Sequence, residues 1–248
     1  MLTGGDDPTT CDRFLGGRLT VRQPAEGYRA GSDPVFLAAT VPARANDRVL
    51  DLGCGVGTAG LCLLARVAGV TVTGLELQPG LAALARANAA ENHLVERLTV
   101  VEGSLTDPPD LGPGFDHVIT NPPWYEAGTV NRPRTATKAI GHVEGDVDLG
   151  AWLKAAVGYL KPKGRLFVIH RADRLGDILA ALGRCPVGAV RVLPLWPRAG
   201  KPAIRVIVSA RRNARTPLEM LPGVVLHREG GGYSDIAEAV LRHGAALD

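Results

Sequence analysis

The segment Asn121-Pro122-Pro123-Trp124 combines side chains that suit chemistry on a weakly nucleophilic nitrogen. Asn121 has an amide oxygen that accepts hydrogen bonds, and the two prolines fix the backbone, so the Pro122 carbonyl is aimed rigidly. These two acceptors can hold both hydrogens of an amide-like or aniline-like nitrogen and favour a pyramidal geometry with a free lone pair. Trp124 adds a flat face for stacking, which contributes about 1–3 kcal/mol for a nucleobase. The segment predicts methyl transfer from a sulfonium without a strong base; the alternative is a rigid loop beside a core tryptophan.

A glycine-rich segment, Asp51-Leu52-Gly53-Cys54-Gly55-Val56-Gly57, fits two ligand-binding templates. Residues 55–60 read G-x-G-x-x-G, which with Glu76 about 20 residues further on is a dinucleotide pattern. Residues 51–57 read D-x-G-x-G-x-G, in which Asp51 can meet the ammonium group of a ligand. In both templates Glu76 ends the second strand, where its carboxylate can accept hydrogen bonds from ribose hydroxyls. The alternative for Glu76 is a surface residue that caps a turn.

The elements that position these segments follow from short apolar runs that alternate with helical stretches. Strands are predicted at residues 49–52, 70–76, 98–101, 115–120 and 165–169, and helices at 58–68, 79–92 and 149–160, the last ended by residues 161–164. This alternation predicts an α/β fold: a Rossmann-like, doubly wound, mostly parallel seven-stranded sheet with helices on both faces. Residues 187–195 and 204–210 are expected to add antiparallel edge strands. The glycine segment and Asn121 then share the carboxyl edge of the sheet, where ligands bind.

The composition is that of an ordinary globular protein. The chain has 248 residues, of which 46% are apolar and 21% charged, and this excludes a disordered chain, a collagen and a coiled coil. No apolar run is long enough to span a bilayer, and residues 1–7 are acidic without an apolar region, so we expect no signal peptide and a cytoplasmic protein. The four cysteines (Cys11, Cys54, Cys62 and Cys185) have no zinc-type spacing, so we expect free thiols and no metal site.

Charge is distributed unevenly along the chain. Residues 1–120 contain 9 Lys and Arg against 14 Asp and Glu, a net charge of −5, whereas residues 121–248 contain 19 against 11, a net charge of +8. A basic C-terminal half suits an anionic partner such as RNA. A solvated basic surface without a partner explains the same numbers equally well.

The motifs in this order resemble those of a known family. Asp51 to Gly57, Glu76-Leu77-Gln78-Pro79 and Asn121 to Trp124 resemble class I S-adenosylmethionine-dependent N-methyltransferases of the N-P-P-[YFW] group. Residues 23–33, 197–203 and 232–234 add a resemblance to the bacterial tRNA (adenine-N6) methyltransferases, which modify the adenine beside the anticodon of a valine tRNA. The resemblance covers about residues 13–245. It implies S-adenosylmethionine as the cofactor, adenine N6 in tRNA as the target, and a methyltransferase domain at residues 47–248.

The resemblance also implies roles for individual residues. Residues 1–46 would form an N-terminal extension, expected to consist of loops, that covers the cofactor. Asn121 and Pro122 would hold the target amine with Trp124 stacked on it, and Arg29 would pair with the cofactor's carboxylate. The implied cofactor-binding residues are Tyr28, Arg29, Asp33, Asp51, Gly53, Gly55, Gly57, Glu76, Leu77, Ser104 and Asn121.

The chain departs from the family pattern at two positions. Where the family has an acid after the third strand to bind the adenine amine of the cofactor, this chain has Gly103-Ser104-Leu105. Ser104 could accept that hydrogen bond, or Asp107 could replace it. The aromatic residue of the second motif is Trp124 where Tyr or Phe is commoner, which points to a different target pocket.

A basic loop follows the Asn-Pro-Pro-Trp segment. Arg132, Arg134 and Lys138 could hold phosphates that flank an extruded nucleotide, and the alternative is a solvated loop. Six further cations are expected near the sheet edges, where they could extend this patch: Lys161, Lys163, Arg165, Arg198, Lys201 and Arg205.

Three other functions stay open at this point. A glutamine-N5 methyltransferase acting on a release factor uses the same Asn-Pro-Pro chemistry, but such enzymes carry a helical N-terminal domain of about 80 residues, and only 48 precede Val49 here. A nicotinamide-dependent oxidoreductase would use the G-x-G-x-x-G run but leaves residues 121–124 unexplained. A catalytically silent RNA-binding module would keep the fold alone.

Overall fold

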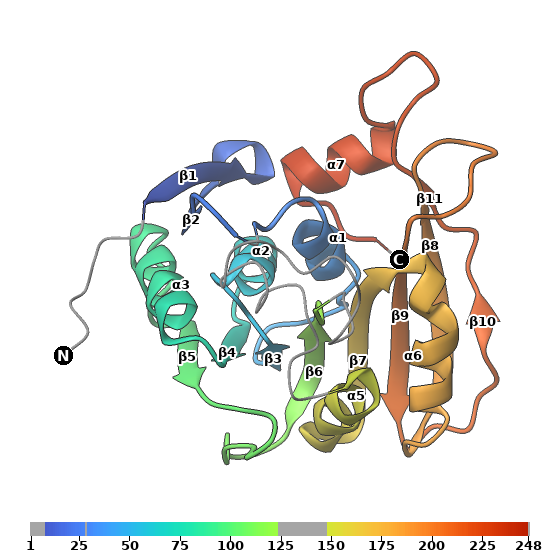
Figure 1. Cartoon of the computed structure of the whole chain (residues 1–248), viewed down its shortest axis with the longest axis horizontal. Coiled ribbons are helices and arrows are strands. Elements are labelled where there is room, and N and C mark those ends of the chain that lie inside the picture. Colours follow the sequence, from blue (N-terminus) through green and yellow to red (C-terminus); the bar gives the residue numbers. More distant parts are fainter. Residues whose placement is uncertain (1–7, 28, 124–147, 248) are drawn as a thin grey trace.

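A mixed β-sheet with helices on both faces forms the body of the molecule (Figure 1). The structure is a computed structural model, and it describes residues 8–27, 29–123 and 148–247. Within them the sheet has nine strands in the order β10-β8-β9-β7-β6-β3-β4-β5, with β11 also paired to β8. The strands are β3 (Arg48–Leu52), β4 (Thr71–Glu76), β5 (Leu98–Glu102), β6 (Phe115–Thr120), β7 (Leu160–Arg171), β8 (Val187–Trp196), β9 (Arg205–Arg212), β10 (Glu219–Met220) and β11 (Val224–Val225).

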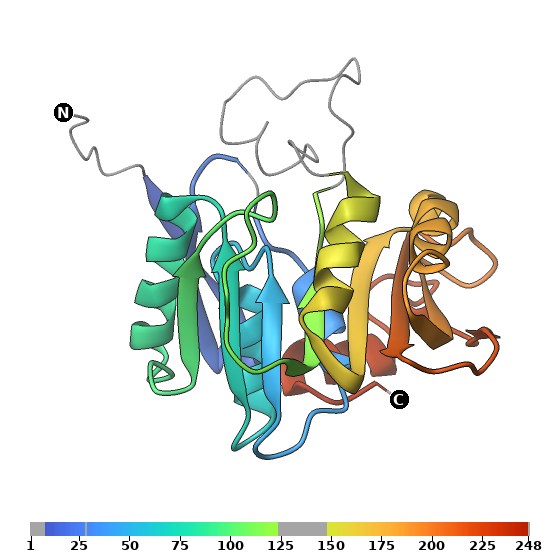
Figure 2. The same ribbon diagram turned by 90° about the horizontal axis from the view of Figure 1, so that it is seen from below.

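The chain winds both ways from the centre of the sheet. It runs from β3 outward through β4 to β5, then returns to β6 on the other side of β3 and continues to β7. All these neighbours are parallel, whereas β9 is antiparallel to both β7 and β8. In Figure 2 the blue strand β3 points to the upper edge and the orange-red β9 points the opposite way. The predicted doubly wound sheet with antiparallel strands at its C-terminal side is confirmed, and the two-residue strands β10 and β11 extend it.

Helices cover the two faces of the sheet with separate apolar clusters. The helices are α1 (Asp33–Ala39), α2 (Thr58–Arg66), α3 (Pro79–Glu91), α5 (Leu149–Gly158), α6 (Leu175–Leu182) and α7 (Asp235–His243). One cluster joins α1, α2, α3 and α7 to the sheet, and the other joins α5 and α6 to the opposite face. Figure 1 shows α1, α2 and α7 on one side of the strands and α5 on the other. Each face therefore has its own core.

The expectation that residues 1–46 consist of loops is wrong. Their described part, residues 8–27 and 29–46, contains a hairpin of β1 (Thr9–Phe14) and β2 (Leu19–Pro24), joined by a single turn η1 (Leu15–Gly17), and then α1. Alternate residues of β2 are buried. The strand is hydrogen-bonded to α3, because the side-chain oxygen of Asn88 accepts from the Arg22 N–H at 2.7 Å. Nearly every residue of α1 is buried, so α1 lacks the amphipathic period that reveals a helix. The division at residue 46 stays a prediction, although apolar residues from both sides of it share one cluster.

The predicted end of the helix at residue 160 is also wrong. The helix α5 ends at Gly158. Residues 161–164, which were expected to form a loop that ends this helix, lie inside the strand β7. Leu160 pairs with Phe115, and the register shifts between Phe115 and His117. A Cβ on Gly164 would lie 2.9 Å from the Phe115 carbonyl oxygen, so this close approach needs a glycine. The helices α6 and α7, which the sequence analysis did not predict, complete the two layers.

Candidate active site

Three neighbouring strands bring the predicted site residues to one edge of the sheet. Leu52 at the end of β3 pairs with Leu75 of β4 on one side and with Thr120 of β6 on the other. The glycine segment follows Leu52, Glu76 follows Leu75, and Asn121 follows Thr120. Because adjacent strands are about 4.8 Å apart, these groups lie close together at the carboxyl edge, as the sequence analysis predicts.

The glycine segment takes a path that only glycine follows without strain. Gly53, Gly55 and Gly57 have φ angles of +72°, +55° and +85°, in the left-handed region. The N–H groups of Gly53 and Cys54 donate to the Leu75 carbonyl at 2.8 and 3.1 Å, which ties the segment to β4. A Cβ on Gly53 would stand 2.7 Å from the Trp152 ring, whereas one on Gly55 would meet no atom within 4 Å. Gly53 therefore packs inward, and Gly55 faces the open side of the loop.

Glu76 binds the glycine segment through its carboxylate. One oxygen accepts from the Gly55 N–H at 2.8 Å and the other from the Gln78 N–H at 2.9 Å. Burial raises the pKa of Glu76, while hydrogen bonds from the Gln78, Gly55 and Leu77 backbones oppose that rise. The carboxylate has room for further hydrogen bonds beyond these two, because each oxygen has two lone pairs.

Asp51 is a second buried acid behind the same loop. It is 3% exposed and accepts a hydrogen bond from the Gly60 N–H at 3.0 Å. Burial raises the pKa of Asp51 to about 7; the Gly60 hydrogen bond lowers it, and the charge of Glu76 raises it further. A cation placed at this loop would relieve the repulsion between the two acids.

The loop after β5 borders Glu76. The Gly103 N–H donates to the Glu76 carbonyl at 3.0 Å. Ser104 shares a hydrogen bond with the Thr106 hydroxyl at 2.8 Å and accepts from the Thr106 N–H at 3.2 Å. Leu77 is 62% exposed beside Glu76, and an exposed leucine between polar loops gives a ligand ring an apolar surface to pack on.

Trp152 and Thr120 connect the glycine segment to the Asn-Pro-Pro corner, and the sequence analysis did not single them out. The Thr120 hydroxyl donates to the Leu52 carbonyl at 2.8 Å and accepts from the Trp152 indole Nε1 at 2.9 Å. Thr120 is fully buried and directly precedes Asn121. Asn121 is half-buried, and Pro122 after it is buried. The register of the strands could not reveal this pair, because Trp152 comes from the helix α5 and not from a strand.

His170 is a second residue that the sequence analysis missed. It lies near the end of β7, is 0% exposed, and its Nδ1 accepts from the Arg171 N–H at 2.9 Å. Its Nε2 has no hydrogen-bond partner within the described part of the chain, and the imidazole as a whole interacts with the backbone of Pro123. Burial, followed by the charge of Arg174, lowers the pKa of His170 to about 4. A neutral imidazole therefore supports the Asn-Pro-Pro corner from below.

The N-terminal segment that the resemblance assigns to the cofactor holds itself together by polar contacts. Arg29 donates to Asp12 at 2.5 Å and to Thr10 at 2.6 Å, and Asp33 accepts from Arg205 of β9 at 2.7 Å. The buried Gln23 forms hydrogen bonds with Ala30 in both directions. These contacts fix residues 29–33 between the hairpin and β9. The predicted roles of Arg29 and Asp33 toward a ligand stay predictions.

Several predicted residues lie outside the described residues, namely Tyr28, Trp124, Arg132, Arg134 and Lys138. The six further cations divide between opposite edges of the sheet. Lys161, Lys163 and Arg165 lie at the beginning of β7, and Arg205 begins the antiparallel β9 beside the end of β7, with Arg198 and Lys201 in the preceding loop. Only the second group of three shares the edge with Asn121.

Within residues 8–27, 29–123 and 148–247, no three His, Cys, Asp or Glu side chains gather as metal ligands would. No helix in those ranges has the length and apolar character to cross a bilayer.

Comparison with known proteins gives one clear group. The family model described as the methyltransferase small domain matches residues 30–182. A protein of Aeromonas hydrophila named tRNA1(Val) (adenine(37)-N6)-methyltransferase is 30% identical over 208 residues, which cover 84% of this chain and 86% of that protein. A protein of the same name from Porphyromonas gingivalis is 29% identical over 234 residues, covering 90% of this chain and 91% of that protein.

Solved structures share the fold. A crystal structure from Agrobacterium tumefaciens, titled a predicted O-methyltransferase, superposes with a TM-score of 0.72 at 26% identity. The superposition covers 87% of this chain and 98% of that one. The similarity therefore extends beyond the sheet to nearly the whole of that molecule.

Proposed function

The chain belongs to the methyltransferase small domain family, and on that footing we propose that it transfers a methyl group from S-adenosylmethionine to N6 of an adenine in tRNA. The names of the relatives support the choice of tRNA and of adenine N6. Of the two templates that fit the glycine segment, the family match favours D-x-G-x-G-x-G over the dinucleotide pattern. A tRNA substrate also implies that the protein acts in the cytoplasm.

One observation carries the proposal: the Asn-Pro-Pro corner adjoins the glycine segment across a single strand pair. Leu52 and Thr120 are register partners, so Gly53 and Asn121 follow from neighbouring positions. The Thr120 hydroxyl and the Trp152 ring fasten the two segments together. A methyl donor on the glycine side therefore lies within reach of an amine that Asn121 holds.

The residues present fit S-adenosylmethionine. Glu76, with both oxygens fixed by backbone N–H groups, would accept hydrogen bonds from the ribose hydroxyls. Asp51 and Glu76 together favour a cation, and the cofactor's ammonium group is one. The exposed Leu77 would pack against the adenine ring, with Ser104 in the adjoining loop as a hydrogen-bond partner for its amine. Gly53, Gly55 and Gly57 let the backbone approach the methionine part.

The cofactor would supply a methyl group bonded to a positively charged sulfur. The lone pair of the target nitrogen would attack the methyl carbon while the carbon–sulfur bond breaks and the sulfur leaves as a neutral thioether. Asn121 and the Pro122 carbonyl would accept the two hydrogens of the target amine and hold its lone pair toward that methyl group. Trp124 would stack on the adenine. Because a methylated aniline-like nitrogen is strongly acidic until it loses its extra proton, an acceptor such as the Asn121 oxygen is enough to guide that proton away. No described side chain has to act as a strong base.

Two flanking segments complete the proposed site. Arg29, Asp33 and Tyr28 would cover the cofactor from the N-terminal side, with Arg29 exchanging Asp12 for the cofactor's carboxylate. The basic loop with Arg132, Arg134 and Lys138 would hold phosphates beside the target nucleotide. The family resemblance supports the first assignment, and the position of the loop directly after the Asn-Pro-Pro-Trp segment supports the second.

Nucleoside mass spectrometry tests the proposal. Valine tRNA purified from cells that lack the protein should lose N6-methyladenosine, and incubation with the protein and S-adenosylmethionine should restore it. The Asn121→Ala variant should bind the cofactor almost as the parent does but turn over at least a hundredfold more slowly, because it lacks one of the two acceptors. Equal turnover in both proteins would remove Asn121 from the mechanism.

Glu76 allows a matched test of cofactor binding. Glu76→Gln keeps one acceptor oxygen and places an amide NH2 against one of the two N–H donors, Gly55 or Gln78, so calorimetry should show at least tenfold weaker binding of S-adenosylmethionine. Glu102 is the register partner of Glu76 on β5 and pairs instead with Arg86 near the surface. Glu102→Gln is therefore the control and should leave binding unchanged. Equal loss in both variants would argue against a specific role for Glu76.

A further inference from the structure

Two loops at the C-terminal side of the sheet come together at the same edge as Asn121. Residues 197–203 follow β8, and residues 226–234 follow β11. Because β8 runs in the direction of β7 and β11 is parallel to β8, both loops leave the sheet at its carboxyl edge. The Leu226 N–H donates to the Trp196 carbonyl at 2.7 Å and the His227 N–H to the Pro197 carbonyl at 3.1 Å. The two loops thus form one surface.

Tyr233 lies on this surface with one side of its ring supported. Its ring stacks on His227 at a centroid distance of 5.0 Å and an interplanar angle of 22°, and the two residues form an isolated antiparallel bridge. Ser234 fixes the base of the loop, because its N–H donates to Leu226 and its hydroxyl to Val225. Tyr233 is nevertheless 37% exposed. A rigid aromatic ring with an exposed part is a platform for stacking.

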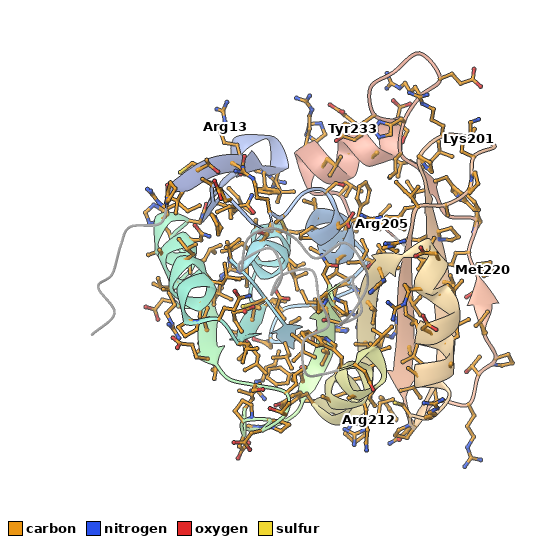
Figure 3. The ribbon with its side chains drawn as sticks, in the orientation of Figure 1. Arg13, Lys201, Arg205, Arg212, Met220 and Tyr233 are labelled. Atoms are coloured by element: carbon orange, nitrogen blue, oxygen red, sulfur yellow. The ribbon has the colours of Figure 1, made fainter. Side chains whose placement is uncertain are left out.

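The loop between β8 and β9 adds two exposed cations to this surface. Arg198 and Lys201 are exposed, and within the described residues neither side chain forms a hydrogen bond or an ion pair. The segment Pro197-Arg198-Ala199-Gly200-Lys201-Pro202-Ala203 contains no acid. The second loop contains one acid, Glu229, and its Arg228 pairs with Asp235. Figure 3 shows Lys201 and Tyr233 in the quarter of the molecule near α7, whereas Arg13 and Arg212 lie apart from them. The surface therefore offers both positive charge and a flat ring.

We propose that this surface, which we call the ledge and define as Arg198, Lys201, His227 and Tyr233, binds the RNA strand next to the target adenine. Tyr233 stacks on a nucleobase, and Arg198 and Lys201 contact phosphates. Nucleic acid suits the ledge because it presents π-faces and phosphates together. The inference rests on the proposed function and deepens it, because it assigns part of the substrate-binding surface.

The separation of the ledge from the target site suits a single strand. From β6, which carries Asn121, the sheet passes through β7, β9 and β8 to β11, beside His227. Four strand spacings of about 4.8 Å correspond to about 19 Å. One RNA strand that crosses the edge of the sheet spans this distance with a few nucleotides.

RNA binding by the full-length chain tests the ledge without methyl transfer. The probes are a fluorescein-labelled valine tRNA transcript and its isolated anticodon stem-loop, titrated by anisotropy in the absence of S-adenosylmethionine. Tyr233→Ala should bind about tenfold more weakly, and Tyr233→Phe should bind as the parent does, because it keeps the ring. The double variant R198E/K201E should bind more weakly and lower the slope of log affinity against log salt by about 2.

Controls separate the ledge from folding and from the proposed function. Lys154 is exposed on α5, which packs on the other face of the sheet, so Lys154→Glu should bind RNA as the parent does. All variants should keep the parent's Kd for S-adenosylmethionine, which shows that they are folded. If Tyr233→Ala and R198E/K201E both bound RNA as tightly as the parent, the proposed RNA-binding role of the ledge would be wrong, even if methylation proceeds. A parent that binds RNA through the ledge yet forms no N6-methyladenosine would instead overturn the proposed function and leave the ledge standing.

Discussion

The indole Nε1 of Trp152 donates a hydrogen bond at 2.9 Å to the hydroxyl of Thr120, the residue directly before Asn121. The same indole ring lies where a Cβ on Gly53 would stand, at 2.7 Å. One side chain from α5 therefore contacts both halves of the site: the loop that would hold the methyl donor and the corner that would hold the amine. Neither half can shift alone without breaking a contact with Trp152.

Replacing Trp152 by Phe should loosen both halves together. The variant loses the hydrogen bond to Thr120 and leaves space beside Gly53, so urea unfolding should show a loss of about 1–3 kcal/mol. Turnover should fall more than cofactor affinity, because the distance between methyl donor and amine matters most in the transition state. Thr120→Val should behave similarly, and the double variant should cost less than the two single changes added together. Strict additivity would show that the two residues act independently.

Gly53 and Gly55 should respond differently to alanine although both have positive φ. Each Gly→Ala change forces a left-handed residue, at about 1–2 kcal/mol. Gly53→Ala also drives a Cβ into Trp152, so it should lower the free energy of unfolding by a further ~1–3 kcal/mol. Gly55→Ala meets no protein atom, and its main effect should be weaker binding of S-adenosylmethionine by calorimetry. The assignment of the open side of the loop to the cofactor would be wrong if Gly55→Ala bound it as tightly as the parent.

The sequence allowed prediction of those parts of the fold and site that depend on local pattern. Strands such as β6 and β4 are short apolar runs, and Asn121 and Glu76 follow them directly, so their meeting at one edge follows from parallel topology. Trp152, Thr120 and His170 could not be predicted, because their roles arise from contacts between elements distant in sequence. The hairpin β1–β2 was missed because its stability comes from packing on α3 and not from its own sequence.

Asp51 should make the stability of the ligand-free protein depend on pH. Its folded pKa of about 7 lies above the unfolded value near 4, so folding favours the protonated acid. Stability from this group is full below pH ~4, decreases as the pH rises toward 7, and is constant above it. Asp51→Asn keeps the acceptor for Gly60 and lacks this titration. The free energy of unfolding of Asp51→Asn should therefore exceed that of the parent by an amount that grows from pH 5 to pH 8. Urea titrations should show a difference of a few kcal/mol at pH 8.

The same ionisation should govern cofactor binding in the opposite direction. An ammonium group binds the carboxylate form of Asp51, so the parent's affinity for S-adenosylmethionine should rise with pH up to about 7 and then level off. Asp51→Asn should bind more weakly at pH 8 and show little change between pH 5.5 and 8. If parent and variant gave parallel profiles in calorimetry, Asp51 would not be the group that meets the ammonium.

His170 should act as a fixed support for the Asn-Pro-Pro corner and not as a titrating base. Its Nδ1 accepts the Arg171 N–H, which places the proton of the neutral ring on Nε2. With a pKa of about 4, the ring stays neutral throughout the working range. Turnover should therefore show no inflection from His170 between pH 5.5 and 8.

Two substitutions at position 170 distinguish two roles for His170, namely positioning the Asn-Pro-Pro corner and simply filling space in the core. Gln carries its amide NH2 near the position of Nε2, whereas Asn can replace only the acceptor at Nδ1. His170→Gln should therefore keep more turnover than His170→Asn, by several-fold, while both keep the parent's Kd for S-adenosylmethionine, because the glycine segment lies two strands away. Single-turnover methylation of valine tRNA measures the first quantity and calorimetry the second. A larger loss in the Gln variant, or equal losses in turnover and in cofactor affinity, would mean that His170 merely fills space beneath β7.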